Sequence, residues 1–492
     1  MIVMKFGGSS LASAAAIEWV TGIVQSRLGE RPVVVVSAMG KTTDRLEEAL
    51  QHASRGSAHS AWRVLEDLRR FHYQEARRLL GSSAAGLLES RIAPKFRALH
   101  LLLIEREEGR RPTPRLKDEV LSYGERLSSE VVAAAFERSG IRTTHVLACE
   151  VIVTDDAFTR AAPLYWETYA RLRRTVAMFA RESVVVMGGF IGATEDGVVT
   201  TLGRGGSDLT ASLVGAGISA DEIQIWKDVD GVLSCDPRVL HGGYRLRSLA
   251  YDEALELAHL GAKVLHPQTA APAVRQGIPI VIRNSRHPDY EGTLIGPRAV
   301  PTDGVVKSIA CMKNIAVVEL ATRETGILRG ISDGLSGLFQ RNQIEIYLVE
   351  ARENGVRFAV GNSQELPKLL RGLDSSVRVV VEEDSALVSL VGGGITSRPS
   401  VKERALSALA GAHIRMQSHG CSRMSVSYAL PESELALSVE RLHREFFRAP
   451  DPEVFAATPE SARRIPLAED PTPRPFSGTQ TPIDLQAGFP SR

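Results

Sequence analysis

The chain has 492 residues, of which 43% are apolar and 24% charged, and its formal net charge is +1 at pH 7. These values are typical of a soluble globular protein with several domains. The balanced charge and the low aromatic content of 5% argue against a broad nucleic-acid surface. No apolar run approaches the roughly 20 residues that a membrane span requires, and the first strand begins at the N-terminus, which leaves no room for a signal peptide. We therefore expect a cytoplasmic protein without nucleic-acid or membrane partners.

The first predicted strand ends at Lys5 and is followed by a glycine turn, Gly7–Ser10, and a helix start. Glycine lets a backbone come close to a ligand because no Cβ blocks the approach. N–H groups at the start of a helix attract anions. The pattern predicts that Lys5 places an ammonium beside the group that the glycines approach.

A second loop of this kind, Ser37–Asp44, follows the apolar run Val33–Val36, which is typical of a buried strand. Its segment Gly40–Thr42 resembles the end of a P-loop. That fingerprint requires a further glycine five residues earlier, where this chain has Val35. We therefore reject a P-loop and expect this loop to offer hydroxyl and amide donors.

The most informative stretch is Thr200–Thr210, between a strand-like run and a helix-like run. Three of the four residues Gly203–Gly206 are glycines, and Arg204 among them offers a planar fork suited to a carboxylate or a phosphate. Ser207 and Asp208 lie where the helix begins, so that neighbouring N–H groups point at an anion. A glycine-rich turn followed by an ordinary Ser/Asp helix cap is the alternative explanation of the same residues.

Apolar strands alternate with helical patterns up to about residue 295, which predicts an α/β fold with a parallel sheet covered by helices on both faces. Residues 57–110 lack strong helix breakers, and we expect a helical insertion there. A further helix is predicted at Lys117–Ser139. The predicted strands include Val33–Val36, Ser183–Met187, Ile223–Trp226 and Ile278–Ile282.

Beyond Ile295 the pattern changes to two small α+β units, at residues 303–362 and 376–446. The expected elements are strands Ile315–Leu320, Ile344–Val349, Val356–Val360, Ala386–Val391, His413–Met416 and Met424–Leu430, and helices ending at Arg341, Ala410 and Phe447. From Ala449 onward Pro, Ser, Thr and Gln accumulate, which predicts a disordered tail.

Five motifs in this order resemble those of the amino acid kinase family and, within it, of the aspartate kinases. They are Lys5–Ser10, Ser122–Ser128, Thr201–Asp208, Trp226–Arg238 and Gly261–Pro267. The resemblance runs through about the first 300 residues. It implies a three-layer amino acid kinase fold with a mostly parallel central sheet, followed by two ferredoxin-like ACT domains. It also implies a monofunctional enzyme of the lysine-sensitive, plant-like type.

The activity that the resemblance implies is ATP-dependent phosphorylation of the side-chain carboxylate of L-aspartate to 4-phospho-L-aspartate. This is the first step of lysine, threonine, methionine and diaminopimelate biosynthesis. We predict a catalytic domain at 1–297, a first ACT-like module at 303–384, a second module at 385–448 and a disordered tail at 449–492. Because the family inserts the first module into the second, residues 305–312 are expected to form a strand of the second module.

Phosphoryl transfer requires positioning and positive charge around the moving group. An aspartate carboxylate has an ordinary pKa of about 3.9, so it is already ionised at neutral pH and needs no general base. The barrier is repulsion between two anions, and we expect Lys5 to offset it. The predicted catalytic residues are Lys5 and Asp208.

By resemblance, Glu125 pairs with the α-ammonium of aspartate and Arg204 with its α-carboxylate. Asp208 lies near the substrate ammonium and the Mg²⁺ region, and both roles stay open. The predicted substrate site comprises Thr43, Glu125, Arg204, Gly205 and Ser207.

The predicted nucleotide site comprises Lys5, Gly7, Gly8, Ser9, Ser37, Lys227, Asp228, Asp236, Arg238 and Lys263. By resemblance to the family, Asp228 is expected near the ribose hydroxyls, and Arg238 and Lys263 are expected to reach the phosphate tail. Mg²⁺ is expected to arrive with ATP. Neither the histidines nor the four cysteines have the spacing of metal ligands.

The resemblance further implies a homodimer or a higher homo-oligomer, with lysine or threonine as an effector at the ACT modules. Tyr347 and Arg352 depart from the lysine-site pattern, although Glu350 and Glu353 lie beside them. Two alternatives remain open: another kinase of the same fold, acting on glutamate or N-acetylglutamate, and a non-catalytic amino-acid sensor.

Overall fold

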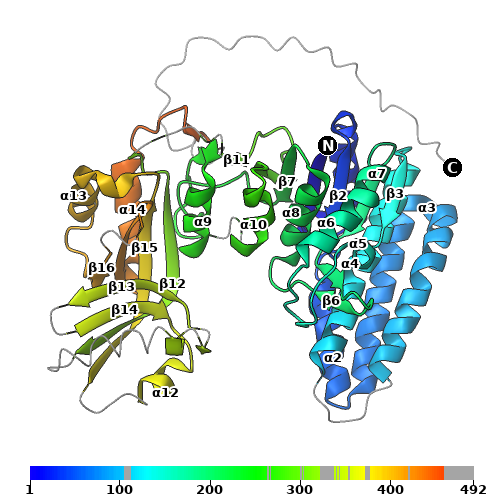
Figure 1. Cartoon of the computed structure of the whole chain (residues 1–492), viewed down its shortest axis with the longest axis horizontal. Coiled ribbons are helices and arrows are strands. Elements are labelled where there is room, and N and C mark those ends of the chain that lie inside the picture. Colours follow the sequence, from blue (N-terminus) through cyan, green and yellow to red (C-terminus); the bar gives the residue numbers. More distant parts are fainter. Residues whose placement is uncertain are drawn as a thin grey trace, which may run out of the picture.

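The computed structural model describes residues 1–104, 112–262, 265, 267–297, 299, 302, 304–321, 337–339, 341–342, 344–352, 355–371, 377–418 and 422–458. Lys263, Glu353 and most of the helix expected to end at Arg341 lie outside these ranges. Two units stand side by side, a helix-covered sheet that carries the N-terminus and a separate sheet at the other end of the molecule (Figure 1).

The first unit is built on an eight-stranded sheet with the order β3-β4-β2-β1-β7-β10-β11-β9. Its strands are β1 (Ile2–Phe6), β2 (Pro32–Val36), β3 (Thr143–Val146), β4 (Val184–Gly188), β7 (Glu222–Lys227), β9 (Ser248–Leu249), β10 (Ile280–Asn284) and β11 (Thr293–Ile295). Neighbouring strands are parallel except for the pair β10 and β11. The predicted α/β fold with a mostly parallel sheet is confirmed.

Helices cover both faces of this sheet, as predicted. They are α1 (Ala14–Gln25), α2 (Thr42–Ser54), α3 (Ala58–Ile104), α4 (Pro114–Arg138), α5 (Ala148–Val151), α6 (Tyr165–Arg174), α7 (Val176–Phe179), α8 (Gly206–Ile218), α9 (Tyr251–His259) and α10 (Pro267–Arg275). Along β1, Ile2, Met4 and Phe6 pack in the core with α1 to α4, while Val3 packs in the core with α6 and α8. The alternation follows from the two-residue period of a strand.

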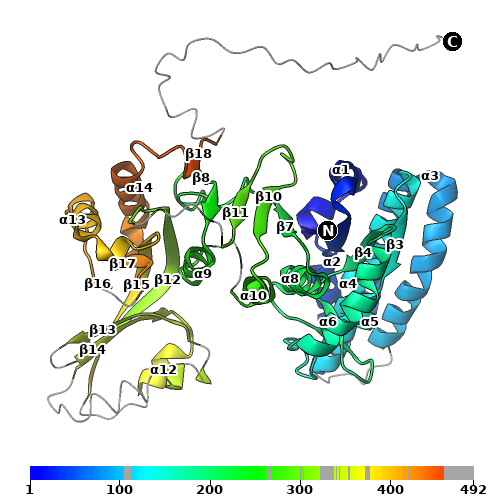
Figure 2. The ribbon, with the colours of Figure 1, turned by 45° about the horizontal axis from the view of Figure 1, so that its top comes forward.

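The insertion predicted at 57–110 is the helix α3, which folds back on itself (Figure 2). The break is at Gly81, whose φ of 74° is readily available only to glycine. The two arms of α3 pack on α2 and α4, outside the sheet.

The second unit is a six-stranded antiparallel sheet with the order β13-β14-β12-β15-β17-β16. Its strands and helices are β12 (Ser308–Ala321), β13 (Ile346–Arg352), β14 (Gly355–Gly361), α12 (Leu366–Arg371), β15 (Arg378–Val391), α13 (Pro399–Ala408), β16 (Met416–Gln417), β17 (Ser425–Pro431) and α14 (Leu435–Phe446). The strand expected at His413–Met416 is shorter and begins later than predicted, because a tight turn joins Ile414 to Ala412.

The two longest strands, β12 and β15, run through both halves of this sheet. The start of β12 at Ser308–Met312 pairs with the end of β15 at Leu387–Val391. Beyond a register shift near Asn314, the rest of β12 pairs with the start of β15. Residues 305–312 were expected to form a strand of the second ACT-like module. The part of β12 in this range, Ser308–Met312, does lie beside the strand Leu387–Val391 of that module.

The prediction of a disordered tail from Ala449 is wrong for the segment up to Thr458. Strand β18 (Phe455–Ala456) pairs with β8 (Arg245–Leu246) of the first unit, and the Phe455 side chain is buried. Composition alone missed this pairing, because its partner lies some 200 residues earlier. The remainder of the predicted tail lies outside the described residues.

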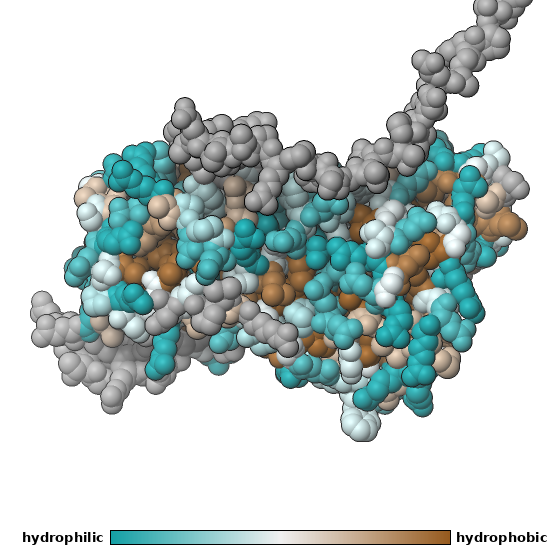
Figure 3. All heavy atoms as spheres, turned by 90° about the horizontal axis from the view of Figure 1, so that it is seen from above, coloured by the Kyte–Doolittle hydropathy of each residue, from teal (hydrophilic) through white to brown (hydrophobic). Residues whose placement is uncertain are grey.

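None of the helices in the described ranges is both long and apolar enough to cross a membrane. On the face seen in Figure 3, hydrophilic side chains predominate and apolar ones form separate patches.

Candidate functional site

Parallel pairing of β1 and β2 brings the first two predicted loops, Gly7–Ser10 and Ser37–Asp44, together. The strands β2, β1 and β7 are neighbours, so the loops after them meet at the carboxyl edge of the sheet, where ligands of open α/β sheets bind. A cavity of about 270 Å³ opens there. Its lining residues are Lys5, Ser37, Thr43, Glu125, Phe190, Gly203, Gly205, Gly206, Ser207 and Asp208. All of them except Phe190, Gly203 and Gly206 were predicted as site residues.

Asp208 joins two lysines at this cavity. The Lys5 Nζ lies 2.7 Å from Asp208 Oδ1, and the Lys227 Nζ lies 3.6 Å from Oδ2. Burial by itself would raise the pKa of Asp208, but the charges of Lys5 and Lys227 outweigh it and hold this pKa below its usual value. Burial also lowers the pKa of Lys227 against the attraction of Asp208. An ionised carboxylate thus fixes two ammonium groups side by side.

Glu125 lies on α4 with only 4% of its surface exposed. Its Oε1 accepts a hydrogen bond from the Ala38 amide at 3.1 Å, while Oε2 is buried without a hydrogen-bond partner in the described part of the chain. Burial raises the pKa of Glu125 to about 8, against the lowering effects of the Ala38 amide and the Lys5 charge. A buried carboxyl oxygen of this kind is poised to receive a cationic group.

Glycines allow the loops to pack this closely. A Cβ on Gly189 would lie 2.7 Å from the Ser207 Cβ, and one on Gly206 would lie 2.7 Å from the Phe190 ring. Helix α8 begins after Gly205, whose φ is 73° and which caps the helix without a side chain. The alternative of an ordinary Ser/Asp cap is therefore wrong, and Ser207 and Asp208 lie in the first turn.

Four predicted nucleotide residues, Lys227, Asp228, Asp236 and Arg238, line a neighbouring cavity of about 370 Å³. Arg238 Nη2 donates to Asp236 Oδ2 at 2.6 Å, which anchors its guanidinium. The remaining wall is largely apolar and includes the segment 308–311 of β12. Sequence reasoning missed this segment because it belongs to the second unit.

Other predicted residues lie apart from these cavities. Arg204 is exposed and does not line the 270 Å³ cavity, although its neighbours do. Ser9 lines a third cavity, of about 400 Å³, which shares Asp228 with the second. The Gly7 amide donates to the Trp226 carbonyl at 3.4 Å, and Gly8 lies against Ala38, whose carbonyl a Cβ would meet at 2.8 Å.

Asp118 was missed by the sequence reasoning. It is fully buried on α4, and its carboxylate accepts from the Thr159 amide at 2.9 Å, the Thr201 amide at 2.8 Å and the Thr201 hydroxyl at 2.7 Å. Thr201 ends strand β6 (Val199–Thr201), directly before the glycine loop. The available signal was an acidic residue two helical turns before Glu125, on the side of α4 that faces the sheet.

Comparison with known proteins agrees with this geometry. A model of the amino acid kinase family matches residues 1–284, and a model of an ACT domain matches residues 388–446. "Aspartokinase 1, chloroplastic" of Arabidopsis thaliana is 33% identical over 466 residues, which cover 91% of this chain and 80% of that protein. "Lysine-sensitive aspartokinase 3" of Escherichia coli (strain K12) is 30% identical, over 91% of this chain and 99% of that protein.

Solved structures resemble the fold over the same range. E. coli aspartokinase III in complex with aspartate and ADP, in its R-state, has a TM-score of 0.78 at 28% identity and covers 91% of this chain and 100% of that chain. The same enzyme in complex with lysine and aspartate, in its T-state, has a TM-score of 0.76 at 29% identity, over 91% and 99% of the two chains. The chain belongs to the amino acid kinase family and, within it, to the aspartokinases.

Proposed function

We propose that this chain phosphorylates the side-chain carboxylate of L-aspartate with ATP, giving 4-phospho-L-aspartate and ADP, as the first step of lysine, threonine and methionine biosynthesis. The observation that carries the proposal is the ion-pair cluster of Lys5, Asp208 and Lys227: Lys5 and Asp208 line the same cavity as the buried Glu125, and Lys227 lines the neighbouring cavity. The structural neighbour that binds aspartate and ADP supports the choice of substrates.

The site binds both the α-ammonium and the α-carboxylate of aspartate. Glu125 Oε2, which is buried and open to a partner, receives the α-ammonium. Arg204, now exposed on the glycine loop, turns inward to hold the α-carboxylate in a bidentate pair. Thr43, Gly205 and the Ser207 hydroxyl complete the polar wall of the substrate cavity.

The acceptor carboxylate attacks the γ-phosphorus as ADP leaves, and no proton needs to be removed first. Lys5 and Lys227 offset the repulsion between the carboxylate and the γ-phosphate. Asp208 holds both ammonium groups in place, so that their positions are set before substrate binds. The Asp208 carboxylate is already paired with two lysines, so it is not the main ligand of a magnesium ion. A magnesium ion at this site would be held mainly by the phosphate oxygens of ATP.

The nucleotide lies along the second cavity. Asp228 binds the ribose hydroxyls, while Arg238, anchored by Asp236, faces the phosphates. Lys263, which lies outside the described residues, is proposed to bind the phosphate tail as well. The loops with Gly7, Gly8, Ser9 and Ser37 lie at the same edge of the sheet and approach the phosphate tail. Mg²⁺ bound to ATP would neutralise part of the phosphate charge.

The second unit is proposed to bind lysine or threonine as a feedback effector and to form a homodimer or a higher homo-oligomer. The Tyr347 hydroxyl donates to Glu345 at 2.8 Å, and Arg352 lies 3.4 Å from Glu350, so both departures from the lysine-site pattern have acidic neighbours. The E. coli neighbour with bound lysine supports this assignment. The predicted domain limits and a cytoplasmic location also stand as proposals, to be tested by limited proteolysis and cell fractionation.

Hydroxamate formation from aspartate, ATP and Mg²⁺ in the presence of hydroxylamine tests the activity. We expect turnover with aspartate and not with glutamate, and a loss of kcat of about 100-fold or more in Lys5→Ala. Lys41→Ala, an exposed lysine on the neighbouring loop, serves as the matched control and should retain activity. No product from a folded protein that still binds ATP would overturn the proposal in favour of an amino-acid sensor.

A further inference from the structure

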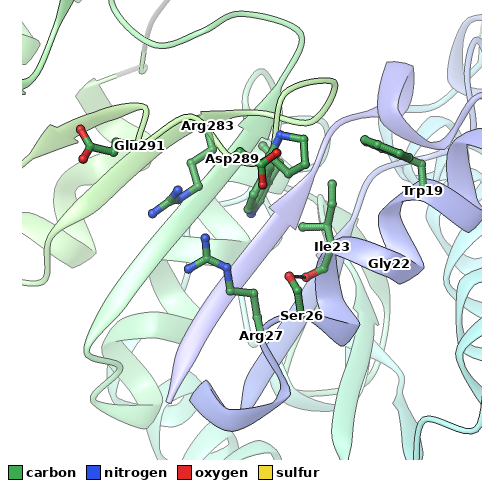
Figure 4. A pocket seen from close by; sticks show the side chains of 10 residues that line it. Trp19, Gly22, Ile23, Ser26, Arg27, Arg283, Asp289 and Glu291 are labelled. Carbon is green, nitrogen blue, oxygen red and sulfur yellow. Dashed lines mark hydrogen bonds between the residues drawn. The ribbon is translucent and has the colours of Figure 1, made fainter. Parts of the chain in front are cut away.

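A cavity of about 560 Å³ lies away from the proposed catalytic cavity. It opens between α1 and β10 and is lined by Trp19, Gly22, Ile23, Ser26, Arg27, Trp226, Arg283, Pro288, Asp289 and Glu291 (Figure 4). Its volume falls in the range of about 300–1,000 Å³ that small-molecule sites occupy. None of its lining residues belongs to the predicted substrate or nucleotide site.

Two arginines from different elements extend into this space. Figure 4 shows the guanidinium groups of Arg27, just beyond the end of α1, and Arg283, on β10, pointing toward the same region. Burial lowers the pKa of Arg283, and the nearby charge of Arg27 lowers it further. Two converging cations repel one another, and an anion placed between them would remove that cost.

The guanidinium of Arg283 has few hydrogen-bond acceptors in the protein. Its Nη1 donates to the Tyr290 carbonyl at 3.3 Å, and its guanidinium lies 5.7 Å from the ring centre of the buried Trp226. Its Nε is enclosed without a hydrogen-bond partner, and within the described ranges no carboxylate lies within 4.0 Å of it. A buried guanidinium donor without an acceptor is costly and indicates a missing partner.

The acidic residues at the rim do not supply that partner. The Glu291 carboxylate pairs with arginines outside the cavity, because it lies 3.4 Å from Arg247 and 3.9 Å from Arg245. Asp289 is exposed, and it forms no ion pair with either cavity arginine within 4.0 Å among the described residues. Arg27 has a partial partner in Glu30, at 3.1 Å, outside the cavity lining.

Apart from Ser26, the uncharged residues that line the cavity are apolar side chains and one glycine. Trp19, 53% exposed, is fixed by a hydrogen bond from its Nε1 to the Ser285 carbonyl, and Ile23 and Pro288 lie on the same cavity. A flat apolar body can pack against such a wall while its anionic end reaches the arginines. We propose that this cavity binds a small aromatic anion, with its phosphate or carboxylate group between Arg27 and Arg283.

Calorimetric titration of the full chain with phenyl phosphate tests the site, with saturating ADP present to block the nucleotide cavity. We expect binding that weakens about tenfold or more in Arg27→Gln and in Arg283→Gln, because each loses a charge-assisted hydrogen bond. Phenol should bind too weakly to measure, and inorganic phosphate more weakly than phenyl phosphate. Arg173→Gln, an exposed arginine on α6, is the control and should bind as the parent chain does.

Gly22→Leu provides a second variant that leaves every charge in place. A Cβ at Gly22 meets no atom within 4 Å, so a leucine side chain enters the open space of the cavity. We expect it to weaken phenyl phosphate binding without lowering the melting temperature. Absence of binding to the parent chain, or equal binding in the parent and all three cavity variants, would overturn the proposal.

Discussion

Burial raises the pKa of Glu125, and this change has consequences for the binding of a charged substrate. Its pKa of about 8 means that most molecules carry a proton on this carboxyl group at pH 7. A bound ammonium favours the ionised form, so aspartate binding should release that proton. The protein would then bind its substrate best where Glu125 is already ionised.

The apparent KM for aspartate is therefore expected to fall as the pH rises from 6 to 8, by at most about tenfold per pH unit, and to level off above 8. Steady-state kinetics over pH 6–9 measure this. Glu125→Gln should raise KM and remove its pH dependence. Glu119→Gln, on the same helix but partly exposed, is the control. A KM profile in Glu125→Gln that parallels the parent would contradict the assignment.

The same raised pKa predicts the pH dependence of stability. The folded state holds the Glu125 proton more tightly than the unfolded state does. The stability that this proton contributes is therefore complete below about pH 4.5, decreases between pH 4.5 and 8, and is lost as the pH rises through about 8. The free energy of unfolding should decline by up to roughly 1.4 kcal/mol per pH unit in that window. Urea denaturation at several pH values should show this decline in the parent and not in Glu125→Gln.

Asp118 holds Thr201, the residue that ends β6 shortly before the glycine loop Gly203–Gly206, without lining the cavity. Asp118→Asn replaces an acceptor by a donor where the amides of Thr159 and Thr201 point, so we expect a loss of about 1–3 kcal/mol of stability. Since the glycine loop follows Thr201, KM for aspartate should rise more than KM for ATP. Asp155→Asn, whose carboxylate holds an exposed turn at Ala157 and Ala162, is the comparison and should change less. Equal changes in both KM values would indicate a general loss of structure.

At the scale of elements, the short strand β18 ties the second unit to the loop that carries Asp236 and Arg238. Phe455 packs edge-on against Tyr244 and Phe447, and the Arg247 amide donates to the Val454 carbonyl. The chain therefore returns to the first unit after α14. This contact gives the segment after Ala449 a structural role.

Phe455→Ala should lower the free energy of unfolding by about 3 kcal/mol, because it removes a buried aromatic ring. KM for ATP should rise, since the loop beside β8 loses its support. Denaturation and steady-state kinetics measure the two effects. Leu437→Ala, on the exposed side of α14, should cost under about 0.5 kcal/mol. A Phe455→Ala protein as stable as the parent would show that β18 does not contribute.

At the scale of the whole molecule, one buried ion pair joins the two units. Lys307, directly before β12, lies 2.7 Å from Glu253 on α9, and both side chains are almost fully buried. Glu253 also accepts from the amides of Ala250 and Gly393. The pair therefore links the helix layer of the first unit to the sheet of the second.

Breaking this pair by Lys307→Met should cost about 3–5 kcal/mol, because Glu253 is left as a buried charge without its cationic partner. The double variant Lys307→Met with Glu253→Gln should recover part of that loss, since no unpaired charge remains. A double-mutant cycle of urea denaturation measures the coupling. The surface pair of Arg142 and Glu182 is the control, with an expected coupling of about 0–1 kcal/mol.

Much of this architecture is local in the sequence and was predicted from it. The strands β2 and β4 are nearly continuous apolar runs, and β1, β7 and β10 are largely apolar. The helical insertion was predicted as well, although α3 is interrupted at Gly81 and contains Pro94. The loops with Lys5 and Ser37 could be expected to meet, because they follow parallel neighbouring strands whose carboxyl ends lie at one edge. The loop with Asp208 follows β6, which pairs antiparallel with β5 (Ile191–Ala193) outside this sheet, and only the structure placed it beside the other two. The sequence by itself thus determined the fold and the family, and it predicted most of the residues that line the central cavity.

Only the tertiary structure decided the features that depend on distant partners. The pairing of Asp208 with both lysines, the raised pKa of Glu125 and the acceptor role of Asp118 arise from burial and from contacts between separate elements. The same holds for β18 and for the cavity between Arg27 and Arg283. The sequence specifies the charge and the type of each residue. The desolvation of a side chain and its distance to a partner from another element are set only when the chain has folded.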